Sequence, residues 1–488
     1  MFLSVLFIHL LMTLSTSLSM PIGQVDEALD QHYDHYRETS INHRRFKHAD
    51  IIPLIKKLKK DKYEVATVGK SVEGRDIYLI KLGTGKTKVL LWSQMHGDEP
   101  TATMALMDMF NFFNQRDSLD PIKNQILEQT TLYIIPMLNP DGAQEYTRRN
   151  AQDLDLNRDA IRLQSPEAQI LKSVRDNLKP DFGFNLHDQN TRYSVGESGN
   201  PATISFLAPP YDHAKSVNDV RGKAMKMIVH LNNILQKYIP NQVAKYSDDH
   251  EPRAFGDNIQ KWGTSTILIE SGGYANDHEK QFIRKLNFIA IVSSLAAIAD
   301  HSYEKAAIEN YYTIPENGRS IFDLIVRNVF IEKDGQIFKS DIGINRYEEN
   351  INNNTQFYYE SKIEEVGDMS VFYGYEELDG EGLFAEEGKV YPKEVIDLNA
   401  LQQLDPHEML KKGYTSVKVL ETQKGKKSSE YPLNIIKKSS KVSNAGMDYN
   451  AIPNFVLKKN GEVHYAIING FIYDVLNNKS SVKNSIVF

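Results

Sequence analysis

Short apolar runs alternate with longer segments of helical periodicity between His48 and Ala299, and no other feature restricts the fold of the 488-residue chain as strongly. Turn-forming residues bound the runs, as is typical of buried strands. The pattern predicts strands at 88–92, 131–136, 183–186 and 266–270, and helices at 101–113 and 283–299. Strands separated by helices favour an α/β fold with a largely buried sheet.

The pattern changes near residue 305, beyond which short alternating segments replace the helices. Asn328–Glu332 and Gln356–Tyr359 are two such segments, and the dipeptides Asp334-Gly335 and Asn460-Gly461 are typical of hairpin turns. We therefore expect three parts, namely a short helical lead-in at 20–47, a main domain at 48–305 and a β-rich accessory domain of unknown role at 310–488.

Phe2 to Met12 is almost unbroken apolar sequence, and small polar residues follow it up to Ser19. This is the pattern of a secretory signal peptide, and the run is too short for a comfortable transmembrane helix. We expect residues 1–19 to be removed and the protein to be exported, to the periplasm or outside the cell. The alternatives are a membrane-anchored N-terminus and a true start at Met20. No transmembrane span is expected in the mature chain.

Charge and cysteine content exclude several classes of site. The net charge of −7 gives no support to nucleic-acid binding, which normally requires a basic face. The chain has no cysteine, so disulfides, thiolate nucleophiles and cysteine-bound metals are excluded. Any metal must therefore be bound by histidines and carboxylates.

A candidate metal site follows the predicted strand at 88–92. His96 and Glu99 are three residues apart, and on a turn that enters a helix this spacing brings both side chains to one side. A third ligand comes from His187, at the end of the predicted strand 183–186. Two histidines and one glutamate, with a position left for water, are typical of hydrolytic zinc sites. A His-x-x-Glu pair alone is common by chance, so the assignment depends on neighbouring motifs.

Further motifs occur in a fixed order around this site. Asn139-Pro140-Asp141-Gly142 is predicted to be a turn after the strand at 131–136, and Asp155-Leu156-Asn157-Arg158 follows it. Glu270 ends the strand at 266–270. Over about residues 48–300 the set resembles the zinc carboxypeptidase family of the carboxypeptidase A type, and in style its bacterial members. The resemblance implies a three-layer α/β/α domain with a mixed central sheet.

The resemblance also implies roles for individual residues. His96, Glu99 and His187 match the ligands of one zinc ion, and Asp155 matches the carboxylate that orients a metal-bound histidine. Asn157 and Arg158 match the pair that binds the terminal carboxylate of a substrate, for which a planar guanidinium is well suited.

The remaining matches concern the reaction itself. Arg148 matches the arginine that stabilises the oxyanion, with its neighbour Arg149 as an alternative. Glu270 matches the general base and acid that activates water and protonates the leaving amine. Tyr246 is the nearest candidate for a substrate-binding loop tyrosine, although an ordinary exposed tyrosine explains it equally well.

The expected function is that of an exported zinc metallocarboxypeptidase that removes C-terminal residues from peptides with a free carboxylate. A related zinc amidohydrolase that acts on cell-wall peptides or N-acyl amino acids uses the same residues and stays open as an alternative. A non-catalytic peptide-binding protein is a third possibility. The presence of Glu270 together with all three ligands argues against it.

Overall fold

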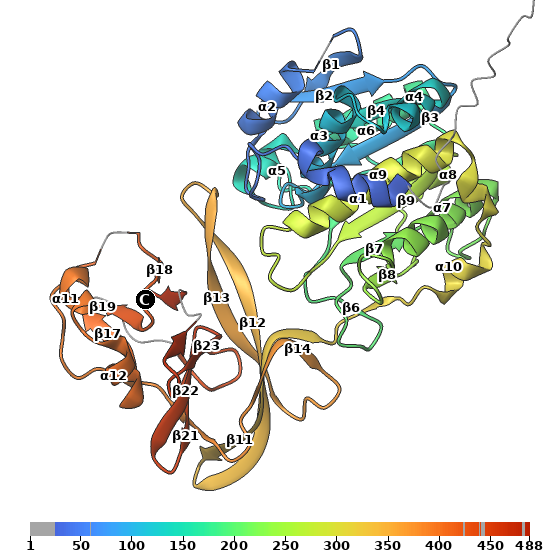
Figure 1. The fold of residues 1–488 in the computed structure, drawn as a ribbon. Helices are drawn as coiled ribbons and strands as arrows, with labels where there is room; N and C mark the ends of the chain where they lie inside the picture. Colours follow the sequence, from blue (N-terminus) through green and yellow to red (C-terminus); the bar gives the residue numbers. More distant parts are fainter. Residues whose placement is uncertain (1–24, 59, 423–424, 439, 441–444, 481–483) are drawn as a thin grey trace, which may run out of the picture.

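The computed structural model describes residues 25–58, 60–422, 425–438, 440, 445–480 and 484–488. The predicted signal peptide, residues 1–19, lies outside the described residues. The chain forms two lobes, which Figure 1 shows in blue to yellow and in orange to red. We call residues 25–318 the N-terminal lobe and residues 321–488 the C-terminal lobe.

An eight-stranded mixed sheet forms the centre of the N-terminal lobe. In spatial order its strands are β1 (Tyr63–Lys70), β2 (Asp76–Leu82), β4 (Thr130–Ile135), β3 (Thr87–Ser93), β5 (Phe182–Asp188), β9 (Ser265–Ser271), β7 (Ile204–Leu207) and β8 (Val243–Lys245). The four central strands, β4, β3, β5 and β9, run parallel, and antiparallel pairs flank them. These four are the strands that the sequence predicts.

Helices cover both faces of this sheet. One face packs on α1 (Val25–Tyr36), α2 (His48–Lys56), α3 (Thr101–Asn114), α4 (Asp120–Gln129), α7 (Asp219–Leu235) and α9 (Gln281–Ala299). The other face packs on α6 (Pro166–Leu178) and α8 (Phe255–Lys261). The predicted α/β fold, with helices on both faces of a mixed sheet, is therefore confirmed.

Helix α9 is apolar around most of its circumference and is buried in the core between neighbouring helices, as expected for such a helix. Within the described residues it is the one helix with the length and hydropathy to cross a membrane, but 83% of the apolar window is buried inside the protein. The expectation of no transmembrane span in the mature chain stays a prediction.

The lead-in wraps around the N-terminal lobe and is bound to its core. The Arg284 side chain of α9 is fully buried and donates to Asp108 Oδ2 of α3 at 2.7 Å. The same guanidinium donates to the backbone oxygens of Glu38 and Ile41 in the lead-in. Removal of either partner of this buried ion pair would leave an uncompensated charge. The fixed Arg284 guanidinium therefore attaches the lead-in to the core of the lobe through its bonds to the backbone.

Long antiparallel strands form the C-terminal lobe, and the most extended are β11 (Ile321–Lys333), β12 (Gln336–Ile351) and β13 (Gln356–Gly367). Both predicted Asp-Gly and Asn-Gly turns are present, with positive φ at both residues, as type I′ hairpins require. They join β11 to β12, and β21 (Ile452–Lys459) to β22 (Glu462–Ile468).

The C-terminal lobe is β-rich, as predicted, but it also contains two short helices that the sequence did not predict. These are α11 (Leu398–Gln402) and α12 (Pro406–Lys411), which pack in a second core with the parallel strands β17 (Tyr414–Val419) and β19 (Asn434–Lys437). After the predicted boundary at 305–310, β10 (Asn317–Gly318) still pairs with β6 (Ser194–Val195) inside the N-terminal lobe, so this lobe extends to residue 318.

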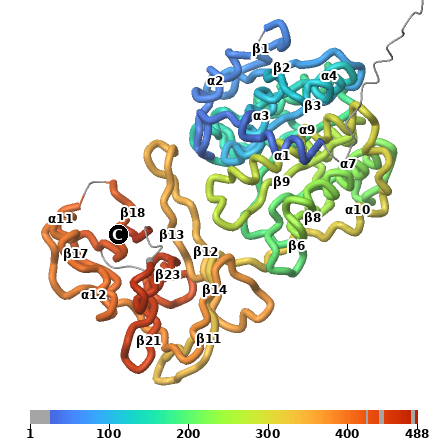
Figure 2. Tube along the Cα trace, in the orientation of Figure 1, coloured from blue at the N-terminus to red at the C-terminus, as the bar shows by residue number. Residues whose placement is uncertain are grey.

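The β12–β13 hairpin extends from the C-terminal lobe to the N-terminal lobe, as Figures 1 and 2 show. Its tip lies against the end of α5 (Pro140–Glu145), where Asn354 Nδ2 donates to Glu145 Oε2 at 2.7 Å. The two lobes are thus in contact beside the carboxyl ends of the central strands.

Candidate metal centre and active site

The three predicted metal ligands lie at the carboxyl ends of adjacent parallel strands, where open α/β sheets place their sites. His96 and Glu99 occupy the loop between β3 and α3, and His187 is the next-to-last residue of β5. In the described part of the chain they form the one group of three metal-binding side chains whose ligand atoms lie within 4.8 Å of one another.

Gly97 is required in this loop because a neighbouring backbone segment lies against it. A Cβ atom at this position would lie 1.9 Å from the carbonyl carbon of Gly142. The residue with positive φ in this loop is Gln94. Gly97 therefore allows close backbone contact between the ligand loop and α5.

The motif Asn139-Pro140-Asp141-Gly142 begins helix α5 and is not the isolated turn that the sequence predicts. Asn139 is the N-cap, and its Oδ1 accepts the N–H of Gly142 at 2.9 Å. Pro140 occupies the first helical position, where its missing N–H has no partner to lose. The prediction was wrong because turns and helix N-termini favour the same residues.

The geometry of the ligand atoms suits a metal ion. Glu99 Oε1 lies 2.7 Å from His96 Nδ1, and Glu99 Oε2 lies 2.7 Å from His187 Nδ1. The two Nδ1 atoms are 3.2 Å apart, close to the separation of about 3.3 Å that zinc–nitrogen bonds of about 2.0–2.1 Å produce in a tetrahedral site. All three residues are buried.

The chemistry of the donors also suits a cation. His96 Nε2 lies 3.2 Å from Asp155 Oδ1, so in the neutral ring the proton belongs on Nε2 and Nδ1 presents a lone pair to Glu99. Burial favours the neutral ring, but the carboxylates of Glu99 and Asp155 outweigh it and raise the pKa of His96 to about 9. The raised pKa shows that this site favours a positive charge. In the neutral ring, His96 Nδ1 and Glu99 Oε1 are two facing acceptors, and a divalent metal ion between them supplies that charge.

Asp155 lies behind His96, at the position expected of an orienting carboxylate. It also accepts the backbone N–H of Asn157 at 2.9 Å, and Arg148 Nε donates to its Oδ2 at 3.1 Å. Burial alone would raise the pKa of Asp155, but His96 and Arg148 lower it below its ordinary value. The carboxylate is therefore ionised and fixed by several donors.

Arg148, and not Arg149, lies at the ligand cluster. Arg148 Nη1 is 3.0 Å from His96 Nδ1 and 3.3 Å from Glu99 Oε1, and 43% of its side chain is exposed. Arg149 Nη1 instead donates to the backbone oxygen of Asp153, away from the cluster. The structure thus separates the two arginines between which the sequence could not choose.

Glu270 lies beside the cluster on the neighbouring strand. Its Cα is the register partner of His187 in the parallel β5–β9 ladder. Burial, and then the nearby Glu99 carboxylate, raise the pKa of Glu270 well above its ordinary value. The backbone N–H of Tyr246 donates to Phe206 O at 2.8 Å, and Phe206 is the register partner of Ile269, next to Glu270. Burial, and then the Glu270 charge, raise the pKa of the Tyr246 phenol. The structure therefore brings Tyr246 toward the predicted base.

Asn157 and Arg158 lie on the turn that follows Asp155. Asn157 Oδ1 accepts the N–H of Phe255 at 2.9 Å, which joins this turn to α8 and leaves the amide NH₂ group for a ligand. Arg158 Nε lies 3.3 Å from Glu251 Oε2, and its side chain is 39% exposed. A carboxylate of the protein thus already pairs with the arginine predicted to bind a substrate carboxylate.

Sequence reasoning missed two acidic residues beside the cluster. Asp188 follows His187 directly, and its Oδ2 accepts bonds from Thr101 at 2.6 Å and Lys280 at 3.1 Å. Burial, and then the Glu99 charge, raise the pKa of Asp98 to about 6. Asp188 is adjacent in sequence to the predicted ligand His187, and Asp98 to the predicted ligand Glu99. This adjacency was the signal that could have identified both residues.

Comparisons with known proteins identify a family that part of this chain matches. Residues 50–200 match the family model described as zinc carboxypeptidase. Carboxypeptidase SOL1 of Arabidopsis thaliana is 33% identical over 137 residues, which is 25% of this chain and 28% of that protein. Human carboxypeptidase D is 26% identical over 145 residues, or 26% of this chain and 10% of that protein. The chain thus matches only a small part of these curated relatives.

Two solved structures are similar to part of this chain. The metallo-carboxypeptidase from Burkholderia cenocepacia has a TM-score of 0.43 and 20% identity over 52% of this chain and 69% of that chain. Carboxypeptidase A from Helicoverpa armigera has a TM-score of 0.41 and 16% identity over 57% of this chain and 81% of that chain. Scores this low carry no argument about function.

The predicted resemblance to the zinc carboxypeptidases is therefore confirmed over residues 50–200. This segment contains His96, Glu99 and His187, but it ends before Glu270 and Tyr246. The family description implies zinc as the metal, and the donor set described above fits that ion.

Proposed function

We propose that the protein is a zinc metallocarboxypeptidase that hydrolyses the C-terminal peptide bond of peptides with a free carboxylate. The observation that carries the proposal is the convergence of His96 Nδ1, Glu99 and His187 Nδ1 beside Glu270, all at the ends of adjacent parallel strands. The family match over residues 50–200 supports the same chemistry.

The proposed site binds zinc through His96, Glu99 and His187. When bound there, zinc lowers the pKa of a coordinated water and polarises a carbonyl group. The raised pKa of Glu270 suits a general base, because its carboxylate then accepts a proton more readily from the attacking water. The same group, once protonated, donates that proton to the leaving amine.

Substrate binding follows from the two arginines. Arg148 lies at the ligand cluster, where its N–H groups donate to the oxygen on which negative charge develops. Arg158 binds the terminal carboxylate of the peptide, and the NH₂ group of Asn157 adds a hydrogen bond. We assign a further substrate contact to Tyr246, whose phenol pKa is raised by burial and then by the Glu270 charge.

The test is the release of C-terminal amino acids from a peptide panel, measured with zinc, after chelation and after zinc is restored. We expect activity with zinc, its loss on chelation and its recovery on reconstitution. Peptides with an amidated C-terminus are the matched control and should react poorly. Full activity after complete removal of zinc would refute the proposal.

Export of the protein is part of the same proposal and rests on residues 1–19 alone. Fractionation of cells that produce the full chain, with N-terminal sequencing of the product, tests it. We expect a product outside the cytoplasm that has lost these residues. A cytoplasmic product that keeps its first residue would refute export without affecting the proposed chemistry.

A further inference from the structure

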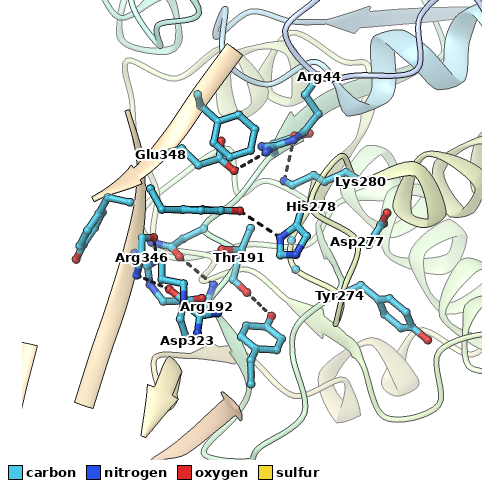
Figure 3. Close-up of a pocket in the computed structure, with 18 of the residues that line it drawn as sticks. Arg44, Thr191, Arg192, Tyr274, Asp277, His278, Lys280, Asp323, Arg346 and Glu348 are labelled. Atoms are coloured by element: carbon cyan, nitrogen blue, oxygen red, sulfur yellow. Dashed lines mark hydrogen bonds and ion pairs between the residues drawn. The ribbon is translucent and has the colours of Figure 1, made fainter. Parts of the chain in front are cut away.

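A cavity of about 980 Å³ lies between the two lobes and reaches the metal-ligand cluster. Glu99 and Arg148 line it on one side, and ten of its 28 lining residues belong to the C-terminal lobe. Figure 3 shows Arg346 and Glu348 of β12 beside Arg192 and Arg44 of the N-terminal lobe. The C-terminal lobe is therefore one wall of the space in front of the proposed site.

Buried ion pairs hold this wall in place. Arg44 Nη2 and Arg45 Nη2 lie 2.5 Å and 2.8 Å from the two carboxylate oxygens of Glu348 on β12. The Arg45 guanidinium lies 4.2 Å from the ring centres of Tyr146 and Phe357, one from each lobe. Both arginine side chains are less than 10% exposed. The Glu348 side chain is 25% exposed, so the contact is largely, but not completely, removed from water.

A second set of contacts comes from the loops that follow the catalytic strands. After β5, Arg192 Nη1 lies 3.2 Å from Asp323 Oδ2, and Thr191 O accepts the hydroxyl of Tyr375 at 2.5 Å. After β9, His278 Nδ1 lies 3.2 Å from the hydroxyl of Tyr359. The strands that carry His187 and Glu270 therefore continue directly into the wall of the cavity.

The cavity is not on the side of the ligand cluster where the terminal carboxylate would bind. The described residues that line it include Glu99 and Arg148, but neither Arg158 nor Glu251. A substrate whose carboxylate binds Arg158 and whose scissile carbonyl lies at Arg148 must continue in another direction. The part of the substrate peptide that precedes the scissile bond then enters the cavity.

The lining of the cavity suits a peptide. Its cations are paired with lining anions, as in Arg346–Glu376 at 2.7 Å and Lys280–Asp188 at 3.1 Å, so the walls have little uncompensated positive charge. Aromatic rings lie among these pairs. The volume is near the upper end of the range of about 300–1,000 Å³ that is typical of ligand sites, which gives room for several residues.

We propose that this cavity is a subsite for the residues upstream of the scissile bond, with the C-terminal lobe as its specificity-determining wall. The inference rests on the proposed function and narrows its substrate to a peptide of several residues, in preference to an N-acyl amino acid. The lobe of unknown role thus becomes part of substrate recognition.

The experiment measures kcat/KM of the zinc-loaded full chain on N-blocked peptides of two, three, four and five residues with one common C-terminal pair. We expect kcat/KM to rise about tenfold from the dipeptide to the pentapeptide, which corresponds to a gain of about 1.4 kcal/mol. Phe357→Ala and Tyr347→Ala both change cavity-lining rings, and each should reduce this ratio toward one.

Tyr358→Ala is the matched control. Tyr358 lies between Phe357 and Tyr359 on β13, and only those two neighbours line the cavity, as the alternation of a strand requires. The control should keep the wild-type ratio. Thermal unfolding identifies any variant that fails to fold. Because Phe357 and Tyr347 lie on different strands, the remaining variant still tests the proposal if one of them does not fold.

The outcomes separate the two proposals. No hydrolysis of any peptide would overturn the proposed function itself. Hydrolysis of the dipeptide, with no increase on lengthening, would overturn only the upstream subsite. A wild-type increase that survives both Phe357→Ala and Tyr347→Ala would likewise refute the role of the C-terminal lobe.

Discussion

His187 and Glu270 are register partners, with Cα atoms opposite each other across the parallel strands β5 and β9. One residue belongs to the proposed metal ligands and the other is the proposed proton carrier. Because side chains at the same register project to the same face of a sheet, one backbone ladder sets the position of both. The relative position of His187 and Glu270 therefore depends on a rigid element and not on a loop.

This relationship predicts that the two functions can be separated by mutation. Glu270→Gln keeps the shape and the ladder but removes the base, so kcat should fall by roughly 100- to 10,000-fold, the range for loss of a general base, while zinc content stays near one ion. His187→Ala should lose the zinc as well. Turnover and metal content are measured on the same preparation, and unchanged turnover in Glu270→Gln would contradict its role.

The neighbouring arginines provide a paired test. Arg148→Lys should lower kcat by roughly 100- to 1,000-fold, because removing a donor to a developing oxyanion has an effect of that size and lysine lacks the planar fork. Arg149→Lys should change kcat little, since Arg149 bonds to Asp153 at the surface. Steady-state kinetics of both variants decide the matter, and the reverse ranking would identify Arg149 as the functional residue.

If Arg158 binds the substrate carboxylate as proposed, Glu251 competes with the substrate for it. Its carboxylate lies 3.3 Å from Arg158 Nε and is also bound by Arg253. Replacing it with glutamine removes the competing charge, so Glu251→Gln should lower KM for peptides with a free carboxylate by a few-fold. Arg158→Ala should raise KM. A parallel change in KM for amidated peptides would show that Glu251 does not act through the carboxylate subsite.

Asp257 makes stability depend on pH. Burial raises the pKa of its carboxyl to about 6, against hydrogen bonds from Glu251 and His250 that lower it. Because the folded-state pKa is above the unfolded value of about 3.9, the contribution to stability is complete below about pH 4 and is lost as pH rises through about 6. The folded protein then carries a buried charge at neutral pH.

Asp257→Asn should therefore gain stability relative to the wild type as pH rises. We expect its free energy of unfolding to improve by about 2 kcal/mol more at pH 7.5 than at pH 4.5. Urea unfolding of both proteins at the two pH values measures this difference. An equal effect of the substitution at both values would contradict the raised pKa.

Removing the metal should destabilise the N-terminal lobe as well as inactivate it. A ligand at 100 times its dissociation constant stabilises the folded state by about 2.7 kcal/mol, so a chelator should lower Tm and zinc should restore it. His187→Ala should show no such response to zinc. Differential scanning calorimetry checks both, and a chelator-sensitive Tm in His187→Ala would place the stabilising ion elsewhere.

The sequence predicts the centre of the fold and of the site well, and the periphery poorly. Strands such as 88–92 are buried on both sides, so their apolar runs are unmistakable. Edge strand β1 is largely exposed and carries no such signal. His96 and Glu99 were predictable because their spacing is local, and His187 because it ends a strand.

Other parts of the site depend on contacts that no local pattern records. The position of Arg148 rather than Arg149 is decided by the fold of the loop before Asp155. The pairing of Arg158 with Glu251 and the cavity between the lobes both join segments far apart in the chain. In such cases composition and periodicity carry no information about the partner.

The salt bridge between Arg44 and Glu348 can form only late in the synthesis of the chain. The two residues are 304 positions apart, and at about 5–20 residues per second synthesis of that interval takes roughly 15–60 s. During this time the emerging N-terminal lobe has its arginines but no hairpin to pair with them. The cavity beside the ligand cluster has no second wall until the hairpin is made, and a chain whose translation stops before Glu348 lacks that wall.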